Sequence, residues 1–204
     1  MPIWGASPDD AYDPHPFSRI AFDDMPPDAN VCVIGAGGGT QVAQAITKNA
    51  RTVVAVDVVP EIFSLLKNRF SWVNADIYNH PRVRTVAMDG LSYIKNSGRQ
   101  FDRIVLAATE SSGKLLVSLF EPGQRLHSLE SFQILSQHLK KDGEIIICRT
   151  VDANQRLFHA YAATLQAAGL TVSGFSTPSA GLESFMLFAS KNPTPRQWGQ
   201  PVRD

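Results

Sequence analysis

A glycine-rich turn is the first feature of this sequence whose residue types and spacing could do chemistry. Residues 35–39 read GAGGG, follow an apolar run and come directly before residues with helical spacing. Glycines there let the backbone bend sharply and let a ligand approach without Cβ atoms in the way. The spacing fits a site for S-adenosylmethionine, whereas Thr40 stands where the dinucleotide pattern has glycine or alanine. A purely structural turn between strand and helix is the alternative.

Two aspartates follow the next two apolar runs. Asp57 comes directly after the run Thr52–Val56, and Asp89 comes shortly after the run Val83–Ala87. An acid at the first place can accept two hydrogen bonds from ribose hydroxyls, or it can simply cap the next helix. An acid at the second place suits the adenine amino group of S-adenosylmethionine, whereas dinucleotide folds do not call for it. We therefore expect this nucleoside to contact Gly35, Ala36, Gly37, Gly39, Asp57, Val58, Asp89, Gly90 and Ala107.

The elements that would position these residues alternate between strand and helix. Short apolar runs predict strands at Val31–Ile34, Thr52–Val56, Val83–Ala87, Phe101–Leu106 and Glu144–Cys148. Helical spacing predicts helices between and after them, each with one apolar face. The expected inward residues are Ile62, Leu65, Leu66 and Phe70 in a helix from Pro60, Phe132, Leu135 and Leu139 in a helix over Ser128–Leu139, and Leu157, Tyr161 and Leu165 in a helix that follows Asp152 and Gln155.

The last two apolar runs have no room for a helix between them. Leu170–Phe175 and Ser184–Ala189 should therefore pair antiparallel. Alternating β and α units closed by such a hairpin form the class I methyltransferase plan, an α/β, Rossmann-like fold with a seven-stranded, mostly parallel sheet. In that strand order Cys32 and Cys148 lie on strands separated by a third, which argues against a disulfide.

The composition excludes several classes of protein. The 204 residues carry 19 Lys and Arg against 19 Asp and Glu, so no global basic field attracts nucleic acid. No run reaches the ~18 apolar residues of a membrane span, and two cysteines inside apolar runs suit a reducing compartment. We expect a cytoplasmic protein that has no nucleic-acid or membrane partner in this chain. The sequence leaves open whether the protein is a homodimer and whether this chain is a piece of a longer protein.

The two ends of the chain differ from its middle. Residues 1–28 are rich in proline and carry six aspartates against one arginine. We expect an acidic N-terminal arm over residues 1–28, an S-adenosylmethionine-binding α/β domain over 29–190 and a tail over 191–204. The histidines have no metal-ligand spacing, so we expect no metal site. His127, beside the predicted helix start at Ser128, could face an acceptor.

Six stretches of the sequence match motifs of one known family. They are Phe17–Ile20, Val31–Gly39, Val53–Asp57, Met88–Gly90, Phe101–Leu106 and Leu139–Gly143. In these stretches the chain resembles the spermidine synthase-like aminopropyltransferases, a branch of the class I S-adenosylmethionine-dependent superfamily. The resemblance implies that Gly35, Gly37, Asp57 and Asp89 hold the nucleoside, and it adds decarboxylated S-adenosylmethionine as a second donor.

The end of the site where the reaction would occur departs from that family. The family's acid in the glycine turn, which holds the amine of decarboxylated S-adenosylmethionine, is replaced here by Gly38. Its acid after the fourth strand, which takes the proton of the attacking amine, falls on Ala107, and alanine accepts no proton. A second acid in that loop falls on Glu110, and a Tyr-Gln pair ahead of the first strand is here Phe17-Ser18.

Three functions fit these residues. Methyl transfer from S-adenosylmethionine to a small or medium acceptor comes first, because in-line alignment suffices when the leaving group is a sulfonium. Glu110 would then orient the acceptor and is the expected catalytic residue. The alternatives are a divergent aminopropyl or aminocarboxypropyl transferase, whose acidic arm would recruit a polyamine, and a catalytically inactive nucleoside-binding domain.

Overall fold

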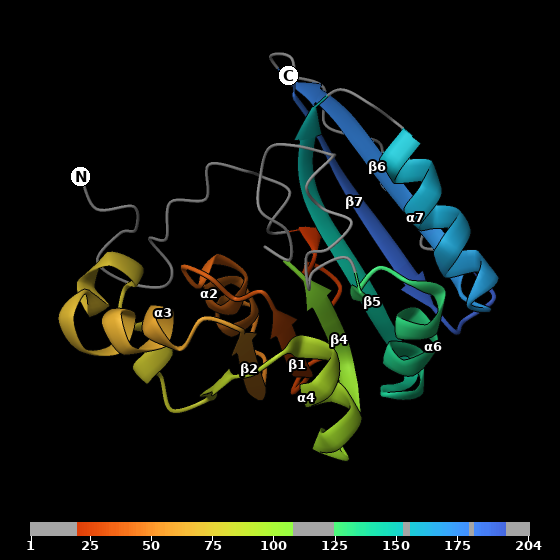
Figure 1. Ribbon diagram of the computed structural model, residues 1–204. Coiled ribbons are helices and arrows are strands. Elements are labelled where there is room, and N and C mark those ends of the chain that lie inside the picture. The colour runs from red at the N-terminus through yellow and green to blue at the C-terminus, as the bar shows by residue number, and fades with distance from the viewer. Residues whose placement is uncertain (1–19, 108–124, 153–155, 180–181, 195–204) are drawn as a thin grey trace.

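One seven-stranded sheet organises the protein (Figure 1). The computed structural model describes residues 20–107, 125–152, 156–179 and 182–194. The strand order is β3-β2-β1-β4-β5-β7-β6, and β7 alone runs antiparallel to its neighbours. This topology confirms the predicted fold. The strands are β1 (Asn30–Ile34), β2 (Thr52–Asp57), β3 (Val83–Ala87), β4 (Phe101–Leu106), β5 (Leu139–Asp152), β6 (Thr171–Ser179) and β7 (Leu182–Ser190).

Helices cover both faces of the sheet, because successive side chains of a strand point to opposite faces. In β1, Val31 and Val33 belong to one core cluster, while Cys32 and Ile34 belong to the other. The first cluster lies under α2 (Thr40–Thr47) and α3 (Pro60–Ser64). The second lies under α4 (Gly90–Ser97), α6 (Leu129–Gln137) and α7 (Arg156–Ala167).

The helix after Pro60 differs from the prediction. Helix α3 ends at Ser64 and continues as a π-helical turn, η2 (Leu65–Arg69), in which the Phe70 N–H donates to the Leu65 carbonyl at 2.8 Å. The wider turn shifts the helical phase by one residue. Phe63 of α3 is buried, whereas Leu65 and Phe70 are 45% and 37% exposed, so the predicted inward stripe is wrong at those two positions.

Two other predicted boundaries also move. Helix α6 ends at Gln137, and Leu139 is buried as the first residue of β5 rather than the last of the helix. The Ser128 side chain caps this helix as predicted, accepting from the Ser131 N–H at 3.2 Å. Gln155, which precedes the predicted helix of Leu157, Tyr161 and Leu165, lies outside the described residues.

The strands β5, β7 and β6 extend past the ends of β1 and β4 (Figure 1). Pairing of β4 with β5 stops at Leu106 and Ile147, but β5 and β7 pair onward to Asp152 and Leu182. The three longer strands therefore rise beside the edge of the sheet at which β1, β2, β3 and β4 end. No disulfide joins Cys32 on β1 to Cys148 on β5, and β4 lies between these two strands.

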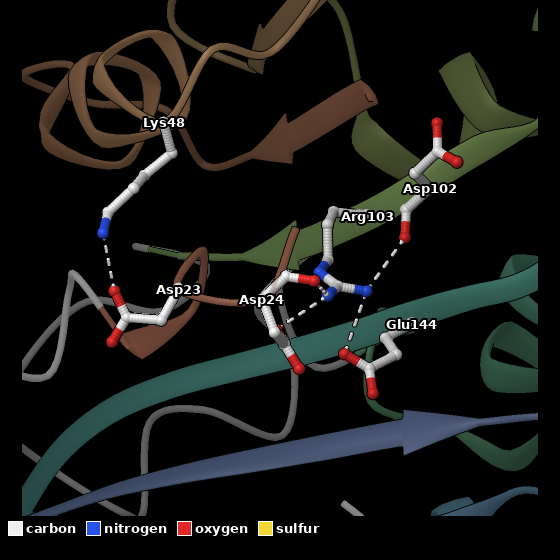
Figure 2. Close-up of polar contacts among 6 residues, drawn as sticks. All are labelled: Asp23, Asp24, Lys48, Asp102, Arg103 and Glu144. Carbon is white, nitrogen blue, oxygen red and sulfur yellow. Dashed lines mark hydrogen bonds and ion pairs between the residues drawn. The ribbon is translucent and has the colours of Figure 1, made fainter. Parts of the chain in front are cut away.

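A segment ahead of β1 packs on the same face as α2. Ala21 and Phe22 are buried in the first core cluster. Asp23 pairs with Lys48 at 2.8 Å, and Asp24 pairs with the buried Arg103 of β4 at 3.0 Å (Figure 2). Two of the six aspartates of the acidic arm are thus held in ion pairs. Among the described residues, no helix is long and apolar enough to cross a membrane.

Candidate functional site

The glycine turn lies at the carboxyl ends of the parallel strands, between β1 and α2. The Gly35 and Ala36 N–H groups both donate to the Val56 carbonyl of β2, at 2.9 and 3.1 Å. Gly39 has a φ of 97°, and a Cβ there would lie 2.9 Å from the Ile77 Cγ2 atom. Only glycine can adopt this left-handed backbone conformation and also leave room for the Ile77 side chain.

Asp57 joins the turn to the end of β2. Its Oδ2 atom accepts from the Gly37 N–H at 2.9 Å, and its Oδ1 atom accepts from the Val59 N–H at 3.0 Å. Asp57 as a whole residue is only 8% exposed. Each carboxylate oxygen can accept a further hydrogen bond, so the group is fixed in place and still able to bind hydroxyls. Asp57 is thus more than a solvated cap of the following helix.

Tyr78 supports the glycine turn through its hydroxyl group. It lies in η4 (Ile77–Asn79), is 1% exposed, and its hydroxyl lies 2.6 Å from the Gly37 carbonyl oxygen and 3.1 Å from that of Ala36. Burial and the nearby Asp57 charge raise the pKa of Tyr78 above its ordinary value, so the phenol keeps its proton and donates. No local sequence pattern predicts this contact, because 41 residues separate the two partners.

Asp89 and Gly90 lie at the next strand end. Asp89 is the N-cap of α4, and its Oδ1 atom accepts from the Ser92 N–H at 2.8 Å. The Met88 N–H donates to the Asp57 carbonyl at 2.9 Å, which brings the two predicted acidic positions to one edge. A Cβ on Gly90 would lie 2.3 Å from the Ile34 Cγ2 atom. Close packing of α4 against β1 therefore explains Gly90 independently of any ligand.

Apolar side chains are exposed beside these acids. Val58 is 63% exposed and Met88 is 44% exposed, although both are hydrophobic. Ala107, after β4, donates its N–H to the Ile34 carbonyl at 3.0 Å and packs at the margin of the first core cluster. The structure thus brings all nine predicted nucleoside contacts to the edge at which the first four strands end.

Gly38 is exposed and has open space around it. No atom lies within 4 Å of the place that a Cβ would occupy, and its φ is not positive. The turn can therefore hold a side chain at this position, so sterics do not explain the missing acid.

Several other predicted positions do not form part of this described site. Glu110, Phe17 and Ser18 lie outside the described residues. His127 is 7% exposed and stacks on Tyr161 with ring centroids 4.6 Å apart, so it is a packed histidine and does not face an acceptor. Among the described residues, no group of three or more His, Cys, Asp or Glu could hold a metal ion.

Comparison with known proteins identifies the family. Residues 19–189 match the family described as the Spermine/spermidine synthase domain. The chain belongs to this family. A polyamine aminopropyltransferase from Erwinia tasmaniensis is 25% identical over 179 residues, covering 82% of this chain and 58% of the relative. The chain spans about half the length of the curated relatives it matches.

Solved structures share the fold across the spermidine synthase and methyltransferase branches. A spermidine synthase in complex with the transition-state analogue AdoDATO has a TM-score of 0.67 at 16% identity, covering 86% of this chain and 60% of that one. A precorrin-6y C5,15-methyltransferase from Geobacter metallireducens has a TM-score of 0.61 at 14% identity, covering 86% of both chains. The methyl transfer that the sequence analysis placed first is not confirmed, and the family fits its aminopropyltransferase alternative better.

Proposed function

We propose that this spermidine synthase-like chain binds an adenosyl sulfonium nucleoside and transfers a group from it to a small amine acceptor. The family favours aminopropyl transfer, with decarboxylated S-adenosylmethionine as donor and a polyamine as acceptor. In such a transfer the acceptor nitrogen bonds to the carbon beside sulfur and the carbon–sulfur bond breaks, so that methylthioadenosine leaves with the bonding electron pair. The nitrogen then loses a proton to solvent, because Ala107 cannot accept it.

The observation that carries this proposal is the position of Asp57. Its two oxygens are held by the Gly37 and Val59 N–H groups, at 2.9 and 3.0 Å, directly beside the glycine turn. A carboxylate so fixed offers its remaining lone pairs to two neighbouring hydroxyls, as a ribose requires.

The remaining site residues fit an adenosyl group at the same edge. Asp89 uses its Oδ1 atom to cap α4, and its carboxylate is available to the amino group of an adenine. Val58 and Met88 supply exposed apolar surface for the faces of the base. Glu110 remains the proposed carboxylate for the acceptor.

Methyl transfer from S-adenosylmethionine is the second candidate. The observation in its favour is the chemistry of Gly38 and Ala107, neither of which carries a side chain that could hold an ammonium or accept a proton. Methyl transfer from a sulfonium depends mainly on alignment, so it tolerates both residues.

Calorimetric titration tests the proposal. The ligands are S-adenosylmethionine, its decarboxylated form, S-adenosylhomocysteine, methylthioadenosine and NAD, and we expect the first four to bind. Asp57→Asn should weaken all four, because the amide has one acceptor oxygen in place of two. Asp142→Asn is the matched control, since Asp142 is exposed near the start of β5, at the opposite edge of the sheet.

Product analysis then separates the two reactions. Incubation with each donor and putrescine should release methylthioadenosine from the decarboxylated donor. Formation of S-adenosylhomocysteine with a methyl acceptor would instead support the second candidate. Absence of binding by all four adenosyl ligands would overturn both.

A further inference from the structure

Gly37 of the glycine turn is held at both of its backbone polar groups. Its N–H donates to the Asp57 Oδ2 atom at 2.9 Å, and its carbonyl oxygen accepts from the Tyr78 hydroxyl at 2.6 Å. The Ala36 carbonyl oxygen is farther from the same hydroxyl, at 3.1 Å, so the Gly37 oxygen is the main acceptor of its single proton. The backbone of one glycine thus links the hydroxyl of Tyr78 to the carboxylate of Asp57.

These two hydrogen bonds restrain a residue that has little else to fix its conformation. Gly37 has a φ of 48°, in the left-handed region, and glycine enters that region about as readily as the right-handed one. Apart from the chain neighbours, a Cβ at this position would have a single atom within 4 Å, the Gly35 carbonyl oxygen at 3.9 Å. Packing therefore restrains Gly37 weakly, and release of its carbonyl would let its N–H turn away from Asp57.

The Tyr78 side chain, in contrast, is fixed by packing in the first core cluster. It is 1% exposed, and its ring meets the ring of Phe63 of α3 edge-on, with ring centroids 5.1 Å apart. Because burial raises the pKa of Tyr78, its hydroxyl stays protonated and donates. The position of this donor is therefore set by the core, and the glycine turn adapts to it.

We infer that Tyr78 is a positioning residue for nucleoside binding, because its hydroxyl holds Gly37 in the conformation whose N–H orients the Asp57 carboxylate. This inference rests on the proposed function, in which Asp57 binds the ribose hydroxyls. A carboxylate that loses the Gly37 donor keeps the Val59 donor, at 3.0 Å, and gains freedom to rotate. Ordering it again when the nucleoside binds costs affinity. Tyr78 thus acts through Asp57 and not on the ligand itself.

Titration of a Tyr78→Phe variant with methylthioadenosine tests the inference, since phenylalanine keeps the ring and removes the hydroxyl. We expect about three- to tenfold weaker binding, the size of one hydrogen bond between neutral groups. In an Asp57→Ala background the same substitution should change the affinity by less than about twofold, because the carboxylate through which it acts is absent. Tyr93→Phe is the matched control. Tyr93 of α4 is 8% exposed in the second core cluster, and loss of its hydroxyl should leave the affinity unchanged.

A second ligand gives an independent comparison without a second substitution. The 2′,3′-dideoxy analogue of methylthioadenosine offers no ribose hydroxyls to Asp57. Tyr78→Phe should therefore weaken its binding by less than about twofold. Retained binding of this analogue also shows that the variant is folded.

The same titrations distinguish the ways in which the inference could fail. Equal weakening of both ligands by Tyr78→Phe, or of methylthioadenosine in both backgrounds, would show a general structural role. Unchanged binding of methylthioadenosine in Tyr78→Phe would show no role. Each of these results overturns the inference and leaves the proposed function standing, whereas failure of the unaltered protein to bind any adenosyl ligand would overturn the proposed function itself.

Discussion

At the scale of single residues, the site combines the fixed carboxylate of Asp57 with open space at Gly38. Gly38 directly follows Gly37, whose N–H group donates to Asp57. Asp57 is held by the Gly37 and Val59 N–H groups, so little conformational freedom remains for it to lose when a ligand binds. Gly38 has no atom within 4 Å of its missing Cβ. The candidate site is therefore ordered at Asp57 and has room for a side chain at position 38.

Gly38→Asp should shift the choice of donor. A carboxylate at 38 can pair with an ammonium, so we expect affinity for decarboxylated S-adenosylmethionine to rise about tenfold or more. Affinity for S-adenosylmethionine should rise less, because its own carboxylate is repelled. Calorimetry on both ligands measures the ratio, and Gly38→Asn is the uncharged control. An unchanged ratio in Gly38→Asp would contradict the assignment.

Gly90→Ala should destabilise the fold. Its Cβ would lie 2.3 Å from Ile34 Cγ2, an atom on a stiff β-branched side chain, so α4 or β1 must shift. We expect the free energy of unfolding in urea to fall by about 1–3 kcal/mol. Gly38→Ala, which meets open space, is the control and should change it by less than about 1 kcal/mol. Equal effects of the two variants would argue against the packing explanation.

At the scale of elements, one buried cation joins three segments. Arg103 of β4 is 3% exposed and pairs with Asp24 ahead of β1 at 3.0 Å and with Glu144 of β5 at 2.9 Å (Figure 2). On β5, Lys140 contacts the Asp102 carboxylate at 2.7 Å, and the same oxygen accepts from the Asn30 N–H at 2.7 Å. These contacts fix the segment before β1 on the sheet, at the edge opposite the site.

Arg103→Met should lower the free energy of unfolding by about 3–5 kcal/mol, because it leaves the Glu144 charge buried without its partner. The double variant Arg103→Met with Glu144→Leu should recover most of the loss, since neither charge then remains. Urea denaturation measures both. Lys48→Met is the control, because it breaks an ion pair whose side chains are 38% and 53% exposed and should cost at most about 1 kcal/mol. Additive losses in the double variant would refute this account.

At the scale of the whole molecule, the carboxyl and amino edges of the sheet carry different groups of residues. The carboxyl edge carries the candidate site, beside the extension of β5, β7 and β6, and the amino edge carries the buried ion pairs. Because the chain spans about half the length of its curated relatives, the acceptor and the oligomeric state of the whole protein stay predictions. The domain boundaries at residues 28 and 190 stay predictions as well.

The global stability should depend on pH through Glu144. Burial raises the pKa of Glu144 above its ordinary value of 4.5, and Arg103 opposes that shift only in part. The folded protein therefore holds this proton to higher pH than the unfolded chain does, so stability falls as pH rises above about 4.5. Urea titrations between pH 4.5 and pH 7 should show this fall relative to Glu144→Gln, which has no proton to lose. An unchanged difference across that interval would contradict the prediction.

The sequence by itself determined the elements and their order, because the signals for them are local. Alternating apolar runs predicted the strands, the turn glycines and the two aspartates marked the strand ends, and Ser128 marked a helix start. Parallel strands bring their carboxyl ends to one edge of the sheet. The sequence alone therefore predicts that the expected nucleoside contacts lie together at that edge. The same local reasoning failed at Leu65 and Phe70, where a π-helical turn changed the period.

Only the tertiary structure decided which residues support the site and which are committed elsewhere. Tyr78 reaches the glycine turn across 41 residues, and Arg103 meets Asp24 across 79, and no local pattern encodes such pairings. His127, which precedes α6, stacks on Tyr161 of α7 and is thereby held away from the site. The burial of the Gln41 Oε1 atom likewise follows only from the packing around α2. Burial and hydrogen-bond partners depend on the packing of distant segments, so these roles appear only in the folded chain.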